Sequence, residues 1–271
     1  MRAWLDGHLL DDPHAPAVAV TDHGVTVGDG VFEAIKVVEG VPFALDLHLQ
    51  RLHRSATGLG LAPIDEAAIR QGIKEVLAEP LPLGRLRITV TAGTAPLGSG
   101  RGHGPRTTIV VADGIAPAPD STRAVTVAWP RNERGALAGL KTTSYAENVV
   151  ALAQAHAADA SEAIFPNTVG NLCEGTGTNV FYVVDGELRT PSLASGCLAG
   201  VTRGLIVEWC GVREVDEPIE VLTEASEIFL ASTTRDAQAV VRLDDADLPH
   251  GPVTRDVQEV WRRRERELLG H

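Results

Sequence analysis

The chain contains three lysines, Lys36, Lys74 and Lys141, and the third stands where a lysine could do chemistry. Lys141 follows the small-residue stretch ALAGL and precedes TTSYAEN, with no carboxylate close to it in sequence. Schiff-base formation requires a neutral amine, because only that form attacks a carbonyl carbon, and a lysine in such a setting suits it. We expect Lys74 on the polar side of a helix and Lys36 as an exposed strand residue.

A single acid, Glu174, lies within the segment NLCEGTGTNVF (171–181), among Gly, Thr and Asn and between two expected strands. A carboxylate that enters a buried strand needs a fixed cation or hydrogen-bond donor, since burial otherwise favours its neutral form. A protonated pyridine nitrogen would serve as that partner. An acid that caps its own turn accounts for the pattern equally well.

The segment LAGVTRGLIVEW (198–209) suggests an anion site at the start of a helix. Gly200 allows a close backbone approach, and Val201 and Thr202 open the helix, so free N–H groups, the helix dipole and a hydroxyl converge there. Ordinary helix capping also explains these residues.

A second hydroxyl cluster, Ser232, Thr233 and Thr234, follows the apolar run EIFLA, at the carboxyl end of an expected buried strand. Ligands of α/β proteins commonly bind at such strand ends. A reactive lysine, a lone acid and two hydroxyl-lined anion sites are together the groups that pyridoxal phosphate (PLP) requires.

Several other chemistries lack their motifs. The sequence has no H-E-x-x-H, no G-x-S-x-G and no G-x-x-x-x-G-K-[ST]. GSGRGHG (98–104) is followed by the strand-like RTTIVVAD, whereas a dinucleotide-binding loop must open a helix. The three cysteines are odd in number and lack C-x-x-C spacing, so we predict packed thiols and no metal site.

Composition limits the class of protein. The 271 residues are 44% hydrophobic, enough for a substantial core, and 24 basic against 36 acidic residues give a net charge of −12. This charge disfavours a nucleic-acid partner. No stretch approaches the roughly 20 apolar residues of a membrane span, and the N-terminal segment lacks the features of a signal peptide, so we expect a cytoplasmic protein.

Alternating strand and helix patterns predict an α/β fold. Helices are expected over 48–60, 64–79 and 145–160, in TRGLIVEWC and at the C-terminus, and a hairpin is expected to turn at residues 185–186. The Pro- and Gly-rich segment 113–122 predicts a linker between a small domain, 1–112, and a larger domain, 123–271. The polar loop 94–105 is long enough to suggest a function.

These motifs, in this order, resemble those of the class IV PLP-dependent aminotransferases. The resemblance includes HGVTVGDGVFEAIKVVEG followed by HLQRL, the lysine segment LKTTSYAEN, the acidic segment LCEGTGTNVF, the turn LAGVTR and the turn ASTT. The family includes D-amino-acid transaminases, branched-chain transaminases and aminodeoxychorismate lyases. The resemblance implies the fold-type IV α/β (α+β) architecture, with two domains and PLP in the cleft between them.

The resemblance also implies cofactor roles. Lys141 would form the Schiff base and carry a proton between Cα and C4′, while Glu174 would pair with the pyridine N1–H. Arg51 would grip the phosphate. The other cofactor contacts implied are Tyr145, Leu198, Gly200, Val201, Thr202 and Thr233.

The resemblance indicates the substrate-binding residues less directly than the cofactor-binding ones. The D-specific enzymes place an Arg-x-His pair in a loop as a carboxylate trap; Arg101 and His103 keep that spacing but are displaced in a longer loop, and Phe32 stands where a tyrosine assists the trap. Arg87 is a substitute carboxylate ligand, although a strand arginine in a salt bridge is equally plausible. The turn with Thr233 and Thr234 resembles one whose N–H groups meet the substrate carboxylate.

The motif VGDGVFEAIKV most resembles the D-amino-acid transaminases, because Glu33 stands where lyases tend to have threonine and Val27 where branched-chain enzymes have tyrosine. We therefore predict a homodimeric transaminase that exchanges an amino group between a D-amino acid and an α-keto acid, with loop 94–105 completing the active site of the partner subunit. Alternatives are an aminodeoxychorismate lyase that eliminates pyruvate to give 4-aminobenzoate, a branched-chain L-amino-acid aminotransferase, and a non-catalytic PLP-binding protein.

Overall fold

The computed structural model describes residues 1–270 and divides into two compact units. The first unit comprises Met1–Pro117 and Leu140–Tyr145, and the second comprises Ala118–Gly139 and the chain from Ala146 onward. The segment around Lys141 thus groups with the first unit, whereas the predicted division into 1–112 and 123–271 assigned it to the second domain. The final residue of that predicted domain, 271, lies outside the described residues.

The first unit is built on a six-stranded sheet. In spatial order its strands are β2 (His8–Leu9), β1 (Arg2–Leu5), β6 (Thr108–Gly114), β5 (Leu83–Thr91), β3 (Gly30–Val38) and β4 (Val41–Pro42). The long pair β3 and β5 is antiparallel, with Phe32 opposite Thr89 and Ala34 opposite Arg87. Successive side chains of a strand point to opposite faces, so β3 sends Val31, Glu33 and Ile35 to one face and Phe32 and Lys36 to the other.

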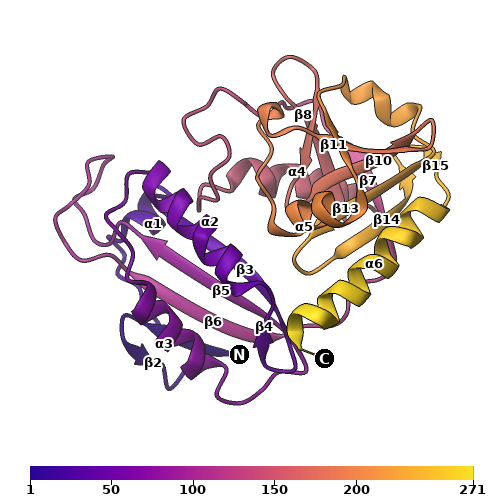
Figure 1. Ribbon diagram of the computed structural model, residues 1–271. Helices are drawn as coiled ribbons and strands as arrows, with labels where there is room; N and C mark the ends of the chain where they lie inside the picture. The colour runs from indigo at the N-terminus through magenta and orange to yellow at the C-terminus, as the bar shows by residue number, and fades with distance from the viewer. Residues whose placement is uncertain (271) are drawn as a thin grey trace. The chain divides into compact units, whose positions relative to one another are not determined.

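Helices cover one face of this sheet (Figure 1). They are α2 (Leu45–Gly58) and α3 (Glu66–Val76), while the short α1 (His23–Thr26) precedes β3. Leu49 and Leu52 of α2 pack with Ile35 and Ile88 of the sheet in a buried apolar core, as their apolar spacing predicts. Asp65 caps α3 by accepting a hydrogen bond from the Ala68 N–H at 3.0 Å.

Lys36 is buried, contrary to the expectation from the sequence. Its side chain is 6% exposed, whereas the alternating pattern predicted an exposed strand residue. The face of β3 opposite the helices is itself substantially covered, and Phe32 on that face is also buried. Strand alternation identifies which residues share a face but not whether that face meets solvent.

The second unit contains a nine-stranded sheet. Its main path runs β12 (Arg213–Val215), β11 (Glu187–Pro191), β10 (Asn179–Val184), β13 (Glu227–Ser232), β14 (Asp236–Leu243), β7 (Ser121–Thr126), β8 (Glu162–Pro166) and β9 (Leu172–Gly175), and β15 (Ala246–Asp247) pairs with β14. Strands β10 and β11 form the predicted hairpin. It turns at Asp185 and Gly186, whose φ angles of 53° and 78° fit a tight two-residue turn.

The helical segments of the second unit are α4 (Ala146–Ala157), η1 (Leu193–Ser195), α5 (Val201–Cys210), η2 (Ile219–Thr223) and α6 (Pro252–Leu269). Buried Glu227 on β13 fixes the start of α6 by accepting from the Thr254 N–H at 2.7 Å. Within residues 1–270, no helix combines the length and apolar character needed to span a bilayer.

Candidate active site

The backbone around Lys141 is fixed from two sides within the first unit. The Phe32 N–H of β3 donates to the Lys141 carbonyl at 3.0 Å, and the Lys141 N–H donates to the Ser55 hydroxyl of α2 at 3.1 Å. An isolated β-bridge between Val31 and Thr142 adds a third contact. The first sheet and α2 therefore position the lysine that the sequence identified.

The Lys141 amine lies beside two aromatic rings. Its Nζ is 4.4 Å from the ring centroid of Phe32 and 5.9 Å from that of Tyr145, and the two rings meet edge to face at 5.2 Å. The Arg87 guanidinium is also 4.0 Å from the Phe32 centroid. The structure thus brings together Lys141, Phe32, Tyr145 and Arg87, and the lysine amine and the guanidinium share one aromatic ring.

Burial lowers the pKa of Arg87, and the nearby positive charge of Arg85 acts in the same direction. The Arg87 guanidinium nevertheless remains exposed, and its Nε donates to the Thr89 hydroxyl at 3.3 Å. Of the two interpretations of Arg87 in the sequence, a carboxylate ligand and a salt-bridged strand residue, an exposed guanidinium bonded to a hydroxyl is compatible with the ligand.

Arg51, the predicted phosphate ligand, lies in a buried charged cluster that the sequence analysis missed. Its Nε and Nη2 atoms donate to the Glu33 carboxylate at 2.8 and 2.7 Å, and His48 Nδ1 donates to the same carboxylate at 2.8 Å. All three side chains are at most 5% exposed. Burial alone would raise the pKa of Glu33, but the bonds from Arg51 and His48 outweigh it and lower that pKa to about 2.

Burial lowers the pKa of His48, and the positive charges of Arg51 and Lys141 lower it further, against the opposing bond to Glu33. Because the Glu33 carboxylate only accepts, the bond between them requires a proton on Nδ1 of His48. Sequence could have signalled this cluster only through polar residues at core positions of β3 and α2.

The predicted substrate residues of loop 94–105 occupy different settings. Arg101 donates to Asp29, to the Gly60 carbonyl and to the Leu59 carbonyl, all within the first unit. His103 is exposed. All three guanidinium nitrogens of Arg101 donate hydrogen bonds, and four of its five N–H groups are used within the first unit.

In the second unit, Glu174 lies on β9 opposite Phe165. One carboxylate oxygen accepts from the Leu198 N–H at 2.9 Å, and the other is 3.3 Å from Nε of Arg131. The Arg131 guanidinium also stacks 4.1 Å from the Phe165 ring centroid. Arg131, which the sequence analysis did not single out, therefore supplies a fixed positive charge to this acid.

The turn that leads into α5 is held against β10. The Asn179 side-chain amide donates to the Leu198 carbonyl at 2.9 Å, and the Gly200 N–H donates to the same carbonyl at 2.8 Å. A Cβ atom on Gly200 would collide with the Asn179 side chain, so this close approach requires glycine. The N-cap residue of α5 is Gly200, which has no side chain to cap the first N–H groups of the helix, at Val201 and Thr202.

The second hydroxyl turn lies at the same edge of the sheet. Asn179 begins β10 and pairs with Ala231 near the end of β13, so the turn containing Thr233 and Thr234 follows directly beside Asn179. The structure therefore gathers Glu174, the Leu198–Thr202 turn and the Thr233 turn within one unit. Nearby Cys173 and Cys197 are buried, and burial raises the pKa of both thiols.

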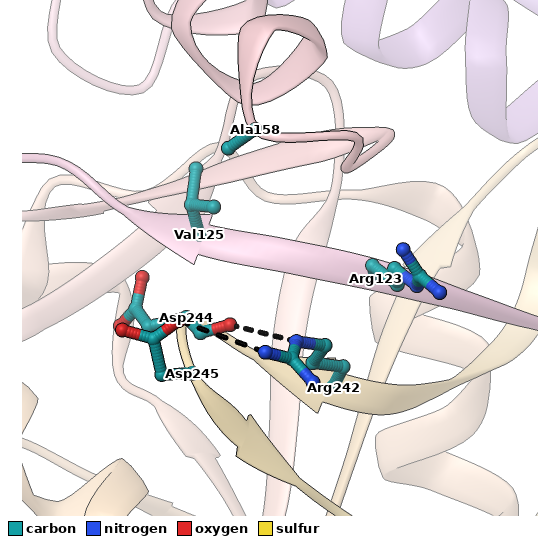
Figure 2. Close-up of a pocket in the computed structure, with 6 residues that line it drawn as sticks. All are labelled: Arg123, Val125, Ala158, Arg242, Asp244 and Asp245. Carbon is teal, nitrogen blue, oxygen red and sulfur yellow. Dashed lines mark hydrogen bonds and ion pairs between the residues drawn. The ribbon is translucent and has the colours of Figure 1, made fainter.

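Figure 2 shows a different feature of the second unit, a pocket of about 540 Å³ lined by Arg123, Val125, Ala158, Arg242, Asp244 and Asp245. Its charges are balanced locally, since Arg123 pairs with Asp159 at 2.5 Å and Arg242 with Asp247 at 3.0 Å. None of the predicted site residues lines this pocket. In residues 1–270, no group of three or more His, Cys, Asp or Glu residues is arranged to hold a metal ion.

Comparison with known proteins identifies the class. The family model of the amino-transferases of class IV matches residues 30–243. A Methanocaldococcus jannaschii protein provisionally named a branched-chain-amino-acid aminotransferase is 32% identical, over 97% of this chain and 96% of its own. The D-alanine aminotransferase of Bacillus licheniformis is 28% identical, over 95% of each chain.

Similar solved structures are also aminotransferases. The branched-chain aminotransferase of Thermoproteus uzoniensis superimposes with a TM-score of 0.91 at 28% identity, covering 100% of this chain and 95% of its own. A PLP-bound hypothetical aminotransferase of Mycobacterium tuberculosis gives a TM-score of 0.85 at 26% identity, covering 97% and 98%. The chain therefore belongs to the class IV aminotransferases, with the fold-type IV architecture, and its cofactor is PLP.

The residues present fit this cofactor. PLP requires an amine for its aldehyde, a carboxylate for its ring nitrogen and N–H donors for its phosphate. The first unit offers the Lys141 amine beside aromatic rings, and the second offers Glu174 held by Leu198 and Arg131. The glycine-dependent turn leads to helix N–H groups that the N-cap residue, Gly200, has no side chain to cap, which suits an anion.

Proposed function

We propose that this chain is a transaminase that exchanges an amino group between a D-amino acid and an α-keto acid. The observation that carries the proposal is that Lys141 Nζ and the Arg87 guanidinium both contact the Phe32 ring, at 4.4 and 4.0 Å from its centroid. An amino acid and a keto acid each present a carboxylate one bond from the reacting carbon. Arg87 would hold that carboxylate while the reacting carbon stays near Lys141.

PLP, when bound, supplies an aldehyde that condenses with amines and a ring that withdraws electrons from the reacting carbon. Lys141 provides the amine and carries a proton on Nζ. Glu174, an anion beside Arg131, accepts the hydrogen bond of the ring nitrogen. Arg51 and the N–H groups of Val201 and Thr202 bind phosphate, with Thr233 as a further donor.

Other members of the predicted site have supporting roles in the proposal. Phe32 and Tyr145 shield the amine from water, and Leu198 presents an apolar side chain to the cofactor ring. The N–H groups at Thr233 and Thr234 assist Arg87 with the carboxylate. The predicted homodimer and cytoplasmic location remain predictions.

The choice of a D-amino acid is supported by the segment VGDGVFEAIKV and by the similarity to the Bacillus D-alanine aminotransferase. The second candidate is a branched-chain L-amino-acid aminotransferase. It is favoured by one contact, because the bonds of Arg101 to Asp29 take up the arginine that a D-specific carboxylate trap would use.

The absorption spectrum of the purified holoenzyme distinguishes these functions. D-alanine and L-leucine are added in separate cuvettes without a keto acid acceptor, and the cofactor band is followed. The proposal predicts that D-alanine alone bleaches the band. Bleaching by L-leucine alone would establish the branched-chain alternative, and consumption of aminodeoxychorismate without any keto acid would establish the lyase.

A further inference from the structure

Loop 94–105 is fastened to its own unit through Asp29. Arg101 makes a bidentate pair with the Asp29 carboxylate, from Nε at 2.7 Å and from Nη2 at 2.6 Å. The same guanidinium donates to the carbonyls of Leu59 and Gly60, just beyond the end of α2. The Asp29 side chain is 10% exposed, so this pair is shielded better than an ordinary surface ion pair.

His23 ties a second point of the loop to the same carboxylate. Its Nδ1 is 2.9 Å from Asp29 and its Nε2 is 3.0 Å from the Gly98 carbonyl oxygen. Both partners are acceptors only, so both contacts are hydrogen bonds when the ring carries two protons. The bond to Asp29 raises the pKa of His23, against burial and the charge of Arg101, which agrees with a cationic ring.

The charged groups around His23 are therefore Asp29 and Arg101. The carboxylate of Asp22, the residue before His23, accepts hydrogen bonds from the Gly24 N–H and from the hydroxyls of Thr91 and Thr107. Asp29 is thus the acid that both loop contacts share.

The residues on either side of Asp29 hold the lysine segment. The Gly30 carbonyl accepts from the Thr143 N–H at 2.8 Å. The Gly28 carbonyl accepts from the Thr143 hydroxyl at 2.8 Å and from the Ser144 hydroxyl at 3.1 Å. Residues 28–30 therefore bind the loop through a side chain and the lysine segment through two carbonyls.

We propose that Asp29 and Arg101 are positioning residues that couple the anchoring of loop 94–105 to the placement of the Lys141 segment. This inference rests on the proposed function only for the importance of Lys141. Neither residue touches the reacting atoms. When the pair is intact, the loop fixes Asp29, and the carbonyls of Gly28 and Gly30 hold residues 143 and 144 in place.

Hydrogen exchange of the holoenzyme tests the coupling without reference to activity. In Asp29→Asn and in Arg101→Met, we expect amides of 94–105 and of 141–145 to exchange about tenfold faster than in the wild type. The matched control is Asp46→Asn, which breaks a similar 2.6 Å pair with Arg70 on the exposed side of the unit and should change neither segment. Arg101 is 37% exposed, so its variant should fold even if the aspartate variant does not.

The exchange rates of the two segments test the coupling and the anchoring separately. Faster exchange in the loop alone would refute the coupling, and unchanged exchange in both segments would refute the anchoring as well. In turnover, the proposal predicts a lower kcat with KM nearly unchanged, partly restored in Arg101→Lys. If the chain proved not to be a transaminase, only this kinetic result would be lost, and the exchange result would still report on the coupling.

Discussion

Arg51 of α2 and Glu33 of β3 form a bidentate ion pair, with N to O distances of 2.8 and 2.7 Å, in the buried interior of the first unit. His48, one turn earlier on α2, donates to the same carboxylate. The pair fixes α2 to β3, and the residue that precedes Glu33 on this strand, Phe32, lies beside the Lys141 amine. The residue proposed to bind phosphate is therefore held in place by an acid that the sequence analysis treated only as a marker of subtype.

Glu33→Gln should destabilise the protein strongly. Removing one partner of a buried ion pair typically costs about 3–5 kcal/mol, because the remaining charge is left without compensation. Chemical denaturation measures the loss. The control Glu66→Gln removes an acid from a partly exposed pair with Arg70 and should change stability by no more than about 1 kcal/mol. Equal effects of the two substitutions would contradict the buried pair.

The contribution of Glu33 should depend on pH in a defined direction. Its pKa in the folded protein, about 2, lies below its ordinary value of 4.5. A lowered pKa stabilises the folded state fully above pH 4.5, and that stabilisation is lost as the pH falls toward 2. The difference in unfolding free energy between the wild type and Glu33→Gln should therefore shrink over this range. A difference that grows with acidification would exclude an ionised Glu33.

Gly200→Ala should weaken PLP retention by about tenfold or more. The added Cβ would collide with Asn179, which holds the turn into α5, and overpacking of this kind costs about 1–3 kcal/mol. Equilibrium dialysis of the cofactor measures the change. Gly204 on the same helix has open space around its Cα, so Gly204→Ala should leave retention unchanged and stabilise the helix by about 0.5–1 kcal/mol.

Arg87→Met should raise the KM for the amino acid about 10- to 100-fold, because a hydrogen bond to a charged group contributes about 1.5–3 kcal/mol. Steady-state kinetics at saturating cofactor provides the measurement. Arg85→Met, which removes a cation two residues away on β5, is the matched control and should leave KM within about threefold. An unchanged KM in Arg87→Met would assign the substrate carboxylate to another residue.

Local patterns in the sequence predicted most of the secondary structure. The apolar spacing of Leu49 and Leu52 predicted α2, and Asp185 with Gly186 predicted the hairpin turn. The turns and the acid of the second unit, from Glu174 to Thr202, also lie together. The similarity to known aminotransferases confirms the predicted family, fold and cofactor.

Contacts between distant segments could not be predicted in this way. Arg101 reaches Asp29 across 72 residues, and Glu33 pairs with Arg51 across 18, and no periodicity in the sequence encodes such partners. Lys36 was wrongly expected to be exposed, because alternation does not reveal what covers a face of a sheet. Arg131 was missed because a lone arginine after a strand is commonplace until the fold brings it to Glu174.

The most direct test of the account is to identify the lysine that binds PLP. Reduction of the holoenzyme with borohydride fixes the cofactor to its lysine, and peptide mass spectrometry locates the adduct among the three lysines of the chain. We expect a single adduct on Lys141. An adduct on buried Lys36 or exposed Lys74, or no adduct after reconstitution with PLP, would contradict it.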